Sequence, residues 1–141
     1  WVKDIGGNIA RVAADGIILD GRAPSAKFDR LESRKAKNGA SPLRILRGRA
    51  SDDGSGVAMV EIALRRDVKG GCEWWQPARR VFRAGSCSSP TWFTPRGVTS
   101  WQYELQMPAG NYKVMTRARD RAGNISDTKS SSSIRRLAIF Q

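Results

Sequence analysis

The sequence predicts an all-β fold, an antiparallel sandwich of about seven strands. Three features predict it: apolar and polar residues alternate with a period of two in several segments, turn-forming residues separate these segments, and helical periodicity is nearly absent. The alternation is clearest in 101–107, where tryptophan, tyrosine, leucine and methionine are interleaved with glutamine and glutamate. A strand with this pattern buries one face and exposes the other, as the strands of a sandwich do.

The predicted strands follow one another along the chain, each bounded by a turn signal. They are 26–31, 43–50, 58–64, 101–107, 112–118 and 133–140. The clearest turn signals are 108–111 and 120–124, whose proline, glycine, asparagine and aspartate residues favour tight reversals. Residues 30–38 are compatible with a single helical turn, which the following glycine and proline would end.

The alternation also predicts the core. Nine side chains on the apolar faces of these strands are expected to be largely buried: Val60, Ile62, Leu64, Trp101, Tyr103, Leu105, Tyr112, Val114 and Leu137.

The chain is strongly basic. Its 141 residues include 25 Lys+Arg and 13 Asp+Glu, for a formal net charge of +12. This balance suggests an anionic neighbour, such as an acidic glycopolymer, nucleic acid or an anionic membrane surface, and the alternative is a merely solubilising charge. Nucleic acid is the least expected partner because no zinc finger, helix-turn-helix or aromatic-basic strand motif is present. We expect no transmembrane segment, because no apolar run approaches roughly 18 residues.

The residue types argue against catalysis. The chain has no histidine, which removes the commonest general base and most zinc sites. No glycine-rich phosphate loop precedes a helix, and the serines at 130–133 have no neighbouring base. We therefore expect a protein that is not an enzyme and has no cofactor, apart from the calcium ion considered below.

Two short segments share one pattern. Residues 2–10 and 118–126 both follow the order apolar, basic, Asp, any residue, small, Gly, Asn, Ile, small. They lie about one domain length apart, which is typical of a tandem array. We therefore predict that residues 1–20 are the end of a preceding repeat or an N-terminal extension, and that residues 21–141 form the sandwich domain.

Five segments have the order and spacing of a known kind of repeat. They lie at 20–24, 48–57, 101–105, 110–114 and 117–124. Over roughly residues 20–141 the chain resembles the bacterial immunoglobulin-like, fibronectin type III-like repeats of secreted and cell-surface proteins. The resemblance implies an immunoglobulin-like β-sandwich and an extracellular or cell-surface location, with no catalysis and no defined ligand. It also implies that Tyr112 bonds back to the preceding corner of the chain.

Cys72 and Cys87 are the only cysteines. In an exported protein an even count favours a disulfide, and the alternative is two free thiols in a cytosolic protein.

Aromatic and basic residues around this pair suggest a ligand patch. The tryptophans at 74 and 75 are adjacent, as are the aromatics at 92 and 93, so in an extended strand one of each pair would face outward. Exposed rings beside arginines could contact a sugar or a protein. The alternative is that the disulfide loop folds over both tryptophans of 74–75 and buries them. The side chains of this possible patch are Trp74, Trp75, Arg79, Arg80, Trp92 and Phe93.

Four carboxylates on predicted loops could hold a calcium ion through their oxygens: Asp4, Asp20, Asp52 and Asp53. For Asp53, as for Asp120, capping of a turn is the competing explanation.

These features leave three functions open. The first is a structural or adhesive spacer in a tandem-repeat surface protein, in contact with adjacent repeats or neighbouring copies. The second is a binding module for an anionic surface glycan or polymer through the basic, tryptophan-rich patch. The third is self-assembly by strand addition, because the apolar residues of 1–20 would seek strand partners.

Overall fold

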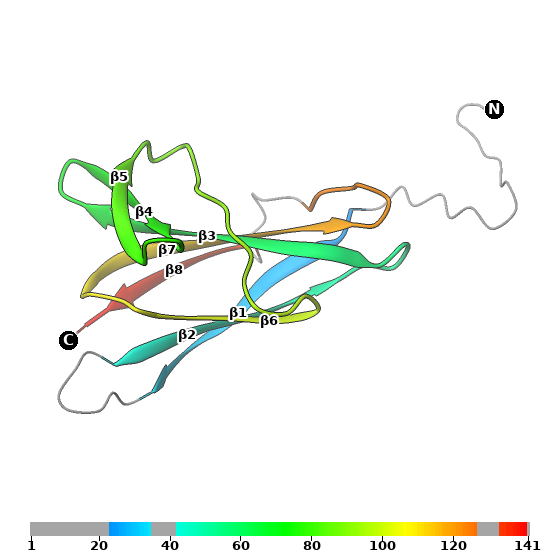
Figure 1. Cartoon of the computed structure of the whole chain (residues 1–141), viewed down its shortest axis with the longest axis horizontal. Helices are drawn as coiled ribbons and strands as arrows, with labels where there is room; N and C mark the ends of the chain where they lie inside the picture. The colour runs from blue at the N-terminus through cyan, green and yellow to red at the C-terminus, as the bar shows by residue number, and fades with distance from the viewer. Residues whose placement is uncertain (1–22, 35–41, 127–132, 141) are drawn as a thin grey trace, which may run out of the picture.

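A computed structural model describes residues 23–34, 42–126 and 133–140. These residues form eight strands and no helix, in two antiparallel sheets that face each other as an immunoglobulin-like sandwich (Figure 1). The prediction of an all-β sandwich is confirmed, with one strand more than the seven expected. Within the described part of the chain, no helix is long and apolar enough to cross a membrane.

The two sheets differ in size. The smaller has the strand order β1-β2-β6, and the larger has the order β5-β4-β3-β7-β8. The strands are β1 (Ser25–Arg34), β2 (Leu43–Ser51), β3 (Val57–Val68), β4 (Gly71–Gln76), β5 (Val81–Gly85), β6 (Ser100–Gln106), β7 (Gly110–Asp120) and β8 (Ile134–Ile139).

Six of these strands overlap the predicted segments. The two that the sequence analysis missed are β4 and β5, a hairpin at the edge of the larger sheet. Its alternation is hidden because two tryptophans are adjacent in β4 and because most of β5 is exposed. The helical turn considered for 30–38 is wrong for residues 30–34, which belong to β1, and the rest of that segment lies outside the described residues.

The core lies between the sheets. Of the nine predicted core side chains, seven are buried, and these are Val60, Ile62, Leu64, Trp101, Leu105, Tyr112 and Val114. Tyr103 and Leu137 are half-buried and pack against this core.

Trp101 fills space that another strand leaves empty. Its cross-strand neighbour in β2 is Gly48. An added Cβ at Gly48 would lie 2.1 Å from Cζ2 of the indole and 2.2 Å from the carbonyl oxygen of Lys27. The indole therefore occupies the position of a missing side chain, and its ring centroid lies 6.4 Å from that of Phe28.

A long connection, residues 86–99, carries the chain from β5 to β6 and from one sheet to the other (Figure 1). On the way it pairs with both sheets. Phe93 forms a bridge with Ile62 of β3, with N–O distances of 2.8 and 2.9 Å, and Arg96 forms one with Gln102 of β6, with both distances 2.8 Å.

Tyr112, near the start of β7, has the structural role that the resemblance implied. Its hydroxyl donates a hydrogen bond to the carbonyl oxygen of Pro108, in the corner before β7. Burial raises the pKa of this hydroxyl. The corner bond of an immunoglobulin-like sandwich is therefore present.

Candidate functional site

The predicted disulfide is confirmed. Cys72 of β4 and Cys87 are bonded, with their Cα atoms 5.2 Å apart. Cys87 lies two residues after the end of β5, so the bond ties the connection 86–99 back onto the first strand of the edge hairpin. The hairpin and this connection therefore form one closed unit.

Trp74 lies under the closed connection. It faces away from the core, on the outer face of the larger sheet, yet it is only 2% exposed. Its indole Nε1 donates a hydrogen bond of 2.7 Å to the carbonyl oxygen of Ser86, and the next outward side chain of β4, Gln76, lies 3.5 Å from the hydroxyl of Thr91. The alternative that the disulfide loop folds over the tryptophans and buries them is therefore confirmed for Trp74.

Trp75 is buried for a different reason. It faces the other sheet and is 4% exposed. Its Nε1 donates a hydrogen bond of 2.8 Å to the hydroxyl of Tyr103 in β6, and its ring lies 5.0 Å from that of Phe82. Of the two alternatives, an exposed ring is therefore wrong and burial of both tryptophans is correct, although the other sheet, and not the disulfide loop, covers Trp75.

The second aromatic pair is also largely covered. Phe93 is buried in the core. Trp92 is half-buried, and the guanidinium carbon of Arg117 lies 4.1 Å from its ring centroid. Arg117 in turn makes an ion pair of 2.8 Å with Glu61. The possible patch consequently offers exposed arginines, at positions 79 and 80, rather than exposed rings.

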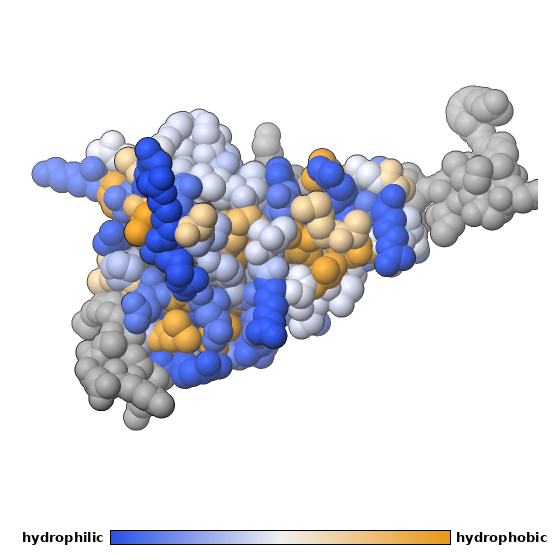
Figure 2. Space-filling view, viewed as in Figure 1, coloured by the Kyte–Doolittle hydropathy of each residue, from blue (hydrophilic) through white to orange (hydrophobic). Residues whose placement is uncertain are grey.

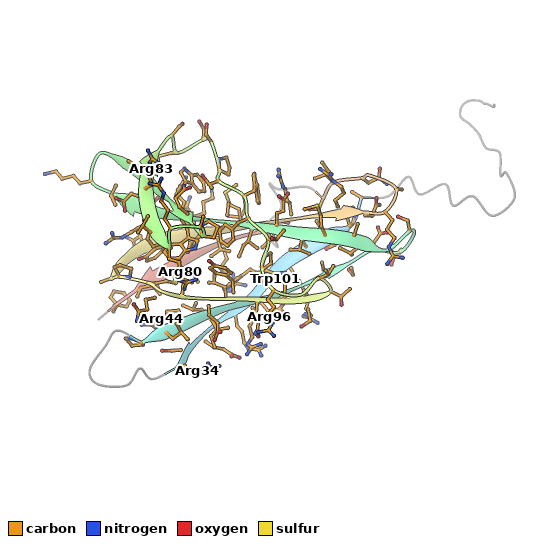
Figure 3. The ribbon with its side chains drawn as sticks, viewed as in Figure 1. Arg34, Arg44, Arg80, Arg83, Arg96 and Trp101 are labelled. Atoms are coloured by element: carbon orange, nitrogen blue, oxygen red, sulfur yellow. A yellow bond between two sulfur atoms is a disulfide. The ribbon has the colours of Figure 1, made fainter. Side chains whose placement is uncertain are left out.

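A cleft of about 650 Å³ lies between the β4–β5 hairpin and the corner 106–109. It brings together two members of the predicted patch, Trp75 and Arg80, and leaves the other four outside. Figure 3 places Arg80 between the hairpin and β6, and Figure 2 shows hydrophilic side chains on both sides of apolar patches on this face. The lining residues are Arg66, Glu73, Trp75, Arg80, Val81, Phe82, Gln106, Pro108 and Ala109.

Backbone carbonyls hold both arginines at the rim of the cleft. Arg80 donates to the carbonyl of Glu104 at 3.2 Å, and Arg66 donates to that of Ala109 at 3.1 Å. Arg66 also lies 3.5 Å from Glu73, which offsets part of its charge. Two fixed guanidinium groups beside an apolar wall suit a small anionic group. Arg66 continues the register of Val60, Ile62 and Leu64, so a signal was present in the sequence: a cation at the inward end of an apolar alternation, which the sequence analysis did not use.

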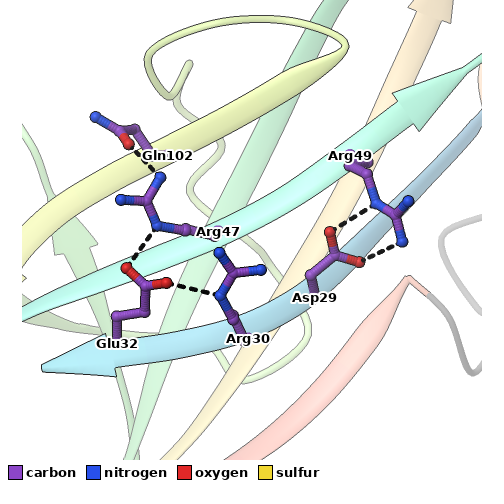
Figure 4. Close-up of polar contacts among 6 residues, drawn as sticks. All are labelled: Asp29, Arg30, Glu32, Arg47, Arg49 and Gln102. Atoms are coloured by element: carbon purple, nitrogen blue, oxygen red, sulfur yellow. Dashed lines mark hydrogen bonds and ion pairs between the residues drawn. The ribbon is translucent and has the colours of Figure 1, made fainter.

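The outer face of the smaller sheet carries a second basic cluster (Figure 4). Glu32 lies between Arg30 and Arg47, 2.7 Å from the Nε atom of each. Beside them, Asp29 accepts two hydrogen bonds from Arg49, the shorter at 2.8 Å.

These ion pairs neutralise much of the charge within the sheet itself. The hydrogen bonds from Arg47 and Arg30 lower the pKa of Glu32, and the hydrogen bond from Arg49 lowers the pKa of Asp29. The arginines of this face therefore already have carboxylate partners.

The carboxylates considered for calcium have other positions or other tasks. Asp52 accepts hydrogen bonds from the backbone N–H of Gly54 at 3.3 Å and of Gly56 at 2.9 Å, so its carboxylate caps the turn after β2. Asp4 and Asp20 lie outside the described residues. Where the chain is described, no three acidic or cysteine side chains gather as a metal site would require.

Comparisons with known proteins assign no family. No protein-family model matches the chain, and the search of curated proteins finds no match either.

Proposed function

We propose that this chain is a structural immunoglobulin-like module of an exported protein and that it acts as a spacer in a tandem array. The sandwich fold and the disulfide support this proposal. Disulfides persist mainly in oxidising surroundings such as the cell exterior, so the Cys72–Cys87 bond is compatible with that location. The observation that carries the proposal is the turn after β7.

Asp120 shapes this turn. Its carboxylate accepts hydrogen bonds from the backbone N–H of Asn124 at 2.8 Å and from the side-chain amide of Asn124 at 3.0 Å. Gly123 has a φ of +96°, a conformation that residues with a side chain rarely adopt. The turn closes through two hydrogen bonds between Ala118 and Ser126, at 2.8 and 2.9 Å. Three residue types are thus required at fixed spacing: Asp, Gly and Asn.

The N-terminal copy of the pattern keeps these three residues. Asp4, Gly7 and Asn8 have the same spacing as the residues that build the turn. Ala10 stands where the turn has Ser126, so one side-chain bond is lost while the backbone bond at that position can still form. Because each shared residue has a separate task, we infer that residues 2–10 encode the same turn at the end of a preceding module.

The charge of one edge strand favours a spacer over a self-assembling subunit. Strand β8 forms one of the two edges of the larger sheet and carries the adjacent cations Arg135 and Arg136. Charged side chains on an edge strand oppose pairing with the edge of another copy. Residues 1–20, on which the expectation of strand addition depended, lie outside the described residues.

A fusion of two modules tests the proposal. In it, residues 21–117 are followed directly by residues 2–141, so that residue 2 takes the place of residue 118. If residues 2–20 complete a module, the fusion holds two folded sandwiches. Its calorimetric unfolding enthalpy should then be about twice that of the original chain, since this enthalpy scales with the number of folded residues.

The matched control is the same fusion with Asp4→Ala, Gly7→Val and Asn8→Ala, which cannot close the turn. This control should unfold with the enthalpy of a single module. The tandem proposal is overturned if the unmodified fusion also shows the enthalpy of one module.

A further inference from the structure

A row of basic side chains crosses the outer face of the larger sheet. In the strand register Arg83 lies opposite Trp74, Trp74 opposite Arg65, Arg65 opposite Lys113, and Lys113 opposite Arg136. The row therefore has one member on each of the five strands. These positions face outward, because the next residues in β3 and β7 belong to the core. Four of the five side chains are cations.

Three of these cations are direct neighbours. Adjacent strands lie about 4.8 Å apart, so Arg65, Lys113 and Arg136 stand within roughly 10 Å. Like charges directly opposite each other destabilise a sheet. Burial and the two flanking arginines lower the pKa of Lys113, while Asp67 acts in the opposite direction. The fold therefore tolerates an electrostatic repulsion among these three side chains, which Lys113→Gln would remove.

The carboxylate beside the row does not cancel this charge. Asp67 makes an ion pair of 3.0 Å with Arg65. Among the described residues, Lys113 and Arg136 have no hydrogen-bond or ion-pair partner for their side chains. A hollow of about 370 Å³ opens beside Arg136, lined in part by Asn111 and Asp67. Two cations without such a partner therefore lie next to a third.

The connection tied back by the disulfide fixes Arg65, the middle member of the row and the first of its three adjacent cations. The side chain of Arg65 is only 14% exposed, and its guanidinium lies 3.4 Å from the carbonyl oxygen of Cys87. The closed connection thus holds Arg65 in place, while Lys113 is half-buried and Arg136 is exposed. A site with one fixed cation and two further cations beside it on neighbouring strands suits a linear anion that runs across the strands.

We propose that Arg65, Lys113 and Arg136 bind an anionic polysaccharide carrying sulfate or phosphate groups, which crosses β3, β7 and β8. Charge complementarity supports this occupant. Single-stranded nucleic acid also needs open aromatic platforms, and on this face Trp74 is buried and Trp92 lies against Arg117. The inference is independent of whether the module belongs to a tandem array.

Binding of the full chain to dextran sulfate tests the site, with uncharged dextran as the ligand control. In about 0.1 M salt, where the Debye length is about 10 Å, we expect the wild type to bind dextran sulfate and not dextran. The variant Lys113→Gln with Arg136→Gln should bind at least about tenfold more weakly, because each charge contact at 4 Å is worth roughly fivefold even in water. Removal of these charges relieves repulsion, so the variant should melt no lower than the wild type.

The matched variant is Arg30→Gln with Arg96→Gln. It removes the same amount of charge from β1 and from the part of the connection 86–99 that pairs with β6. It should weaken binding by no more than about twofold, because salt screens charges beyond about one Debye length. Equal losses in the two variants would overturn the proposal, as would absence of dextran sulfate binding by the wild type. If duplex DNA binds as tightly and with the same dependence on Lys113, the polysaccharide assignment is wrong. Should the double variant unfold, Arg136→Gln alone should weaken binding about fivefold, and unchanged binding would again contradict the site.

Discussion

Gly48→Ala is a small change that should have a large effect on stability. The new Cβ would lie 2.1 Å from the indole of Trp101 and 2.2 Å from the carbonyl oxygen of Lys27. Both distances are far below van der Waals contact, and the second involves backbone, which cannot rotate away. The substitution must therefore displace either the indole from the core or one strand from its neighbour.

The cost can be bounded from these two outcomes. Overpacking of a core usually costs about 1–3 kcal/mol when side chains can adjust. Expulsion of a buried tryptophan costs about as much as its truncation, roughly 3–5 kcal/mol. Because Trp101 is almost fully buried and the clash includes backbone, we expect Gly48→Ala to lie in the upper range. Such a loss would consume a large part of the roughly 5–15 kcal/mol that stabilises a domain.

Urea denaturation followed by tryptophan fluorescence measures this loss. Trp101→Ala provides the reference, and the double variant should cost less than the sum of the two single changes if the indole is what the new methyl group displaces. Gly71→Ala is the control, because a Cβ there meets nothing within 4 Å and no unusual φ is required. A Gly48→Ala protein within about 1 kcal/mol of wild type would refute the proposed packing of Trp101 against Gly48.

Three further predictions concern other bonds of the fold. Reduction, or Cys72→Ser with Cys87→Ser, should lower the free energy of unfolding by about 3 kcal/mol in urea titrations, since the loop has about 15 residues; an unchanged midpoint would contradict this. Burial raises the pKa of Tyr112 above its ordinary value of 10.0. The contribution of the neutral hydroxyl to stability should therefore be fully present below pH 10 and be lost as the pH rises through the higher folded-state pKa. Tyr112→Phe should abolish this loss in thermal melts at alkaline pH. The pKa values of Asp29 and Glu32 are lowered, so their contribution to stability should be present above about pH 4 and be lost as the pH falls through the folded-state pKa values. Thermal melts at acid pH that are the same at low and high salt would contradict this contribution of the two ion pairs.

The parts of the fold that follow from local pattern were predictable from the sequence. Residues 101–107 alternate because β6 has one buried face, and most of the predicted core side chains are buried for the same reason. The hairpin β4–β5 was not predictable in this way. Trp75 is covered by the opposite sheet and Trp74 by a connection that the disulfide holds in place. Both covers come from residues distant in the sequence, so the local pattern is simply two adjacent apolar residues.

The candidate sites depend even more on strand register. Arg65, Lys113 and Arg136 each have the sequence signature of an ordinary exposed strand position. Their alignment exists only because β7 pairs with β3 on one side and with β8 on the other. A shift of one residue in either pairing would move one cation to the opposite face of the sheet. Charge counts in the sequence could therefore indicate an anionic partner but could not place it.

The disulfide also has a mechanical consequence for a spacer under tension. If the ends of the module are pulled until it unfolds, the 15-residue segment between the bonded cysteines stays a closed loop and adds nothing to the stretched length. An extended chain spans about 3.4 Å per residue, so the bond withholds roughly 50 Å from each unfolded module. Reduction would release this hidden length, and the maximum reach of a stretched array would then depend on the redox state of its surroundings.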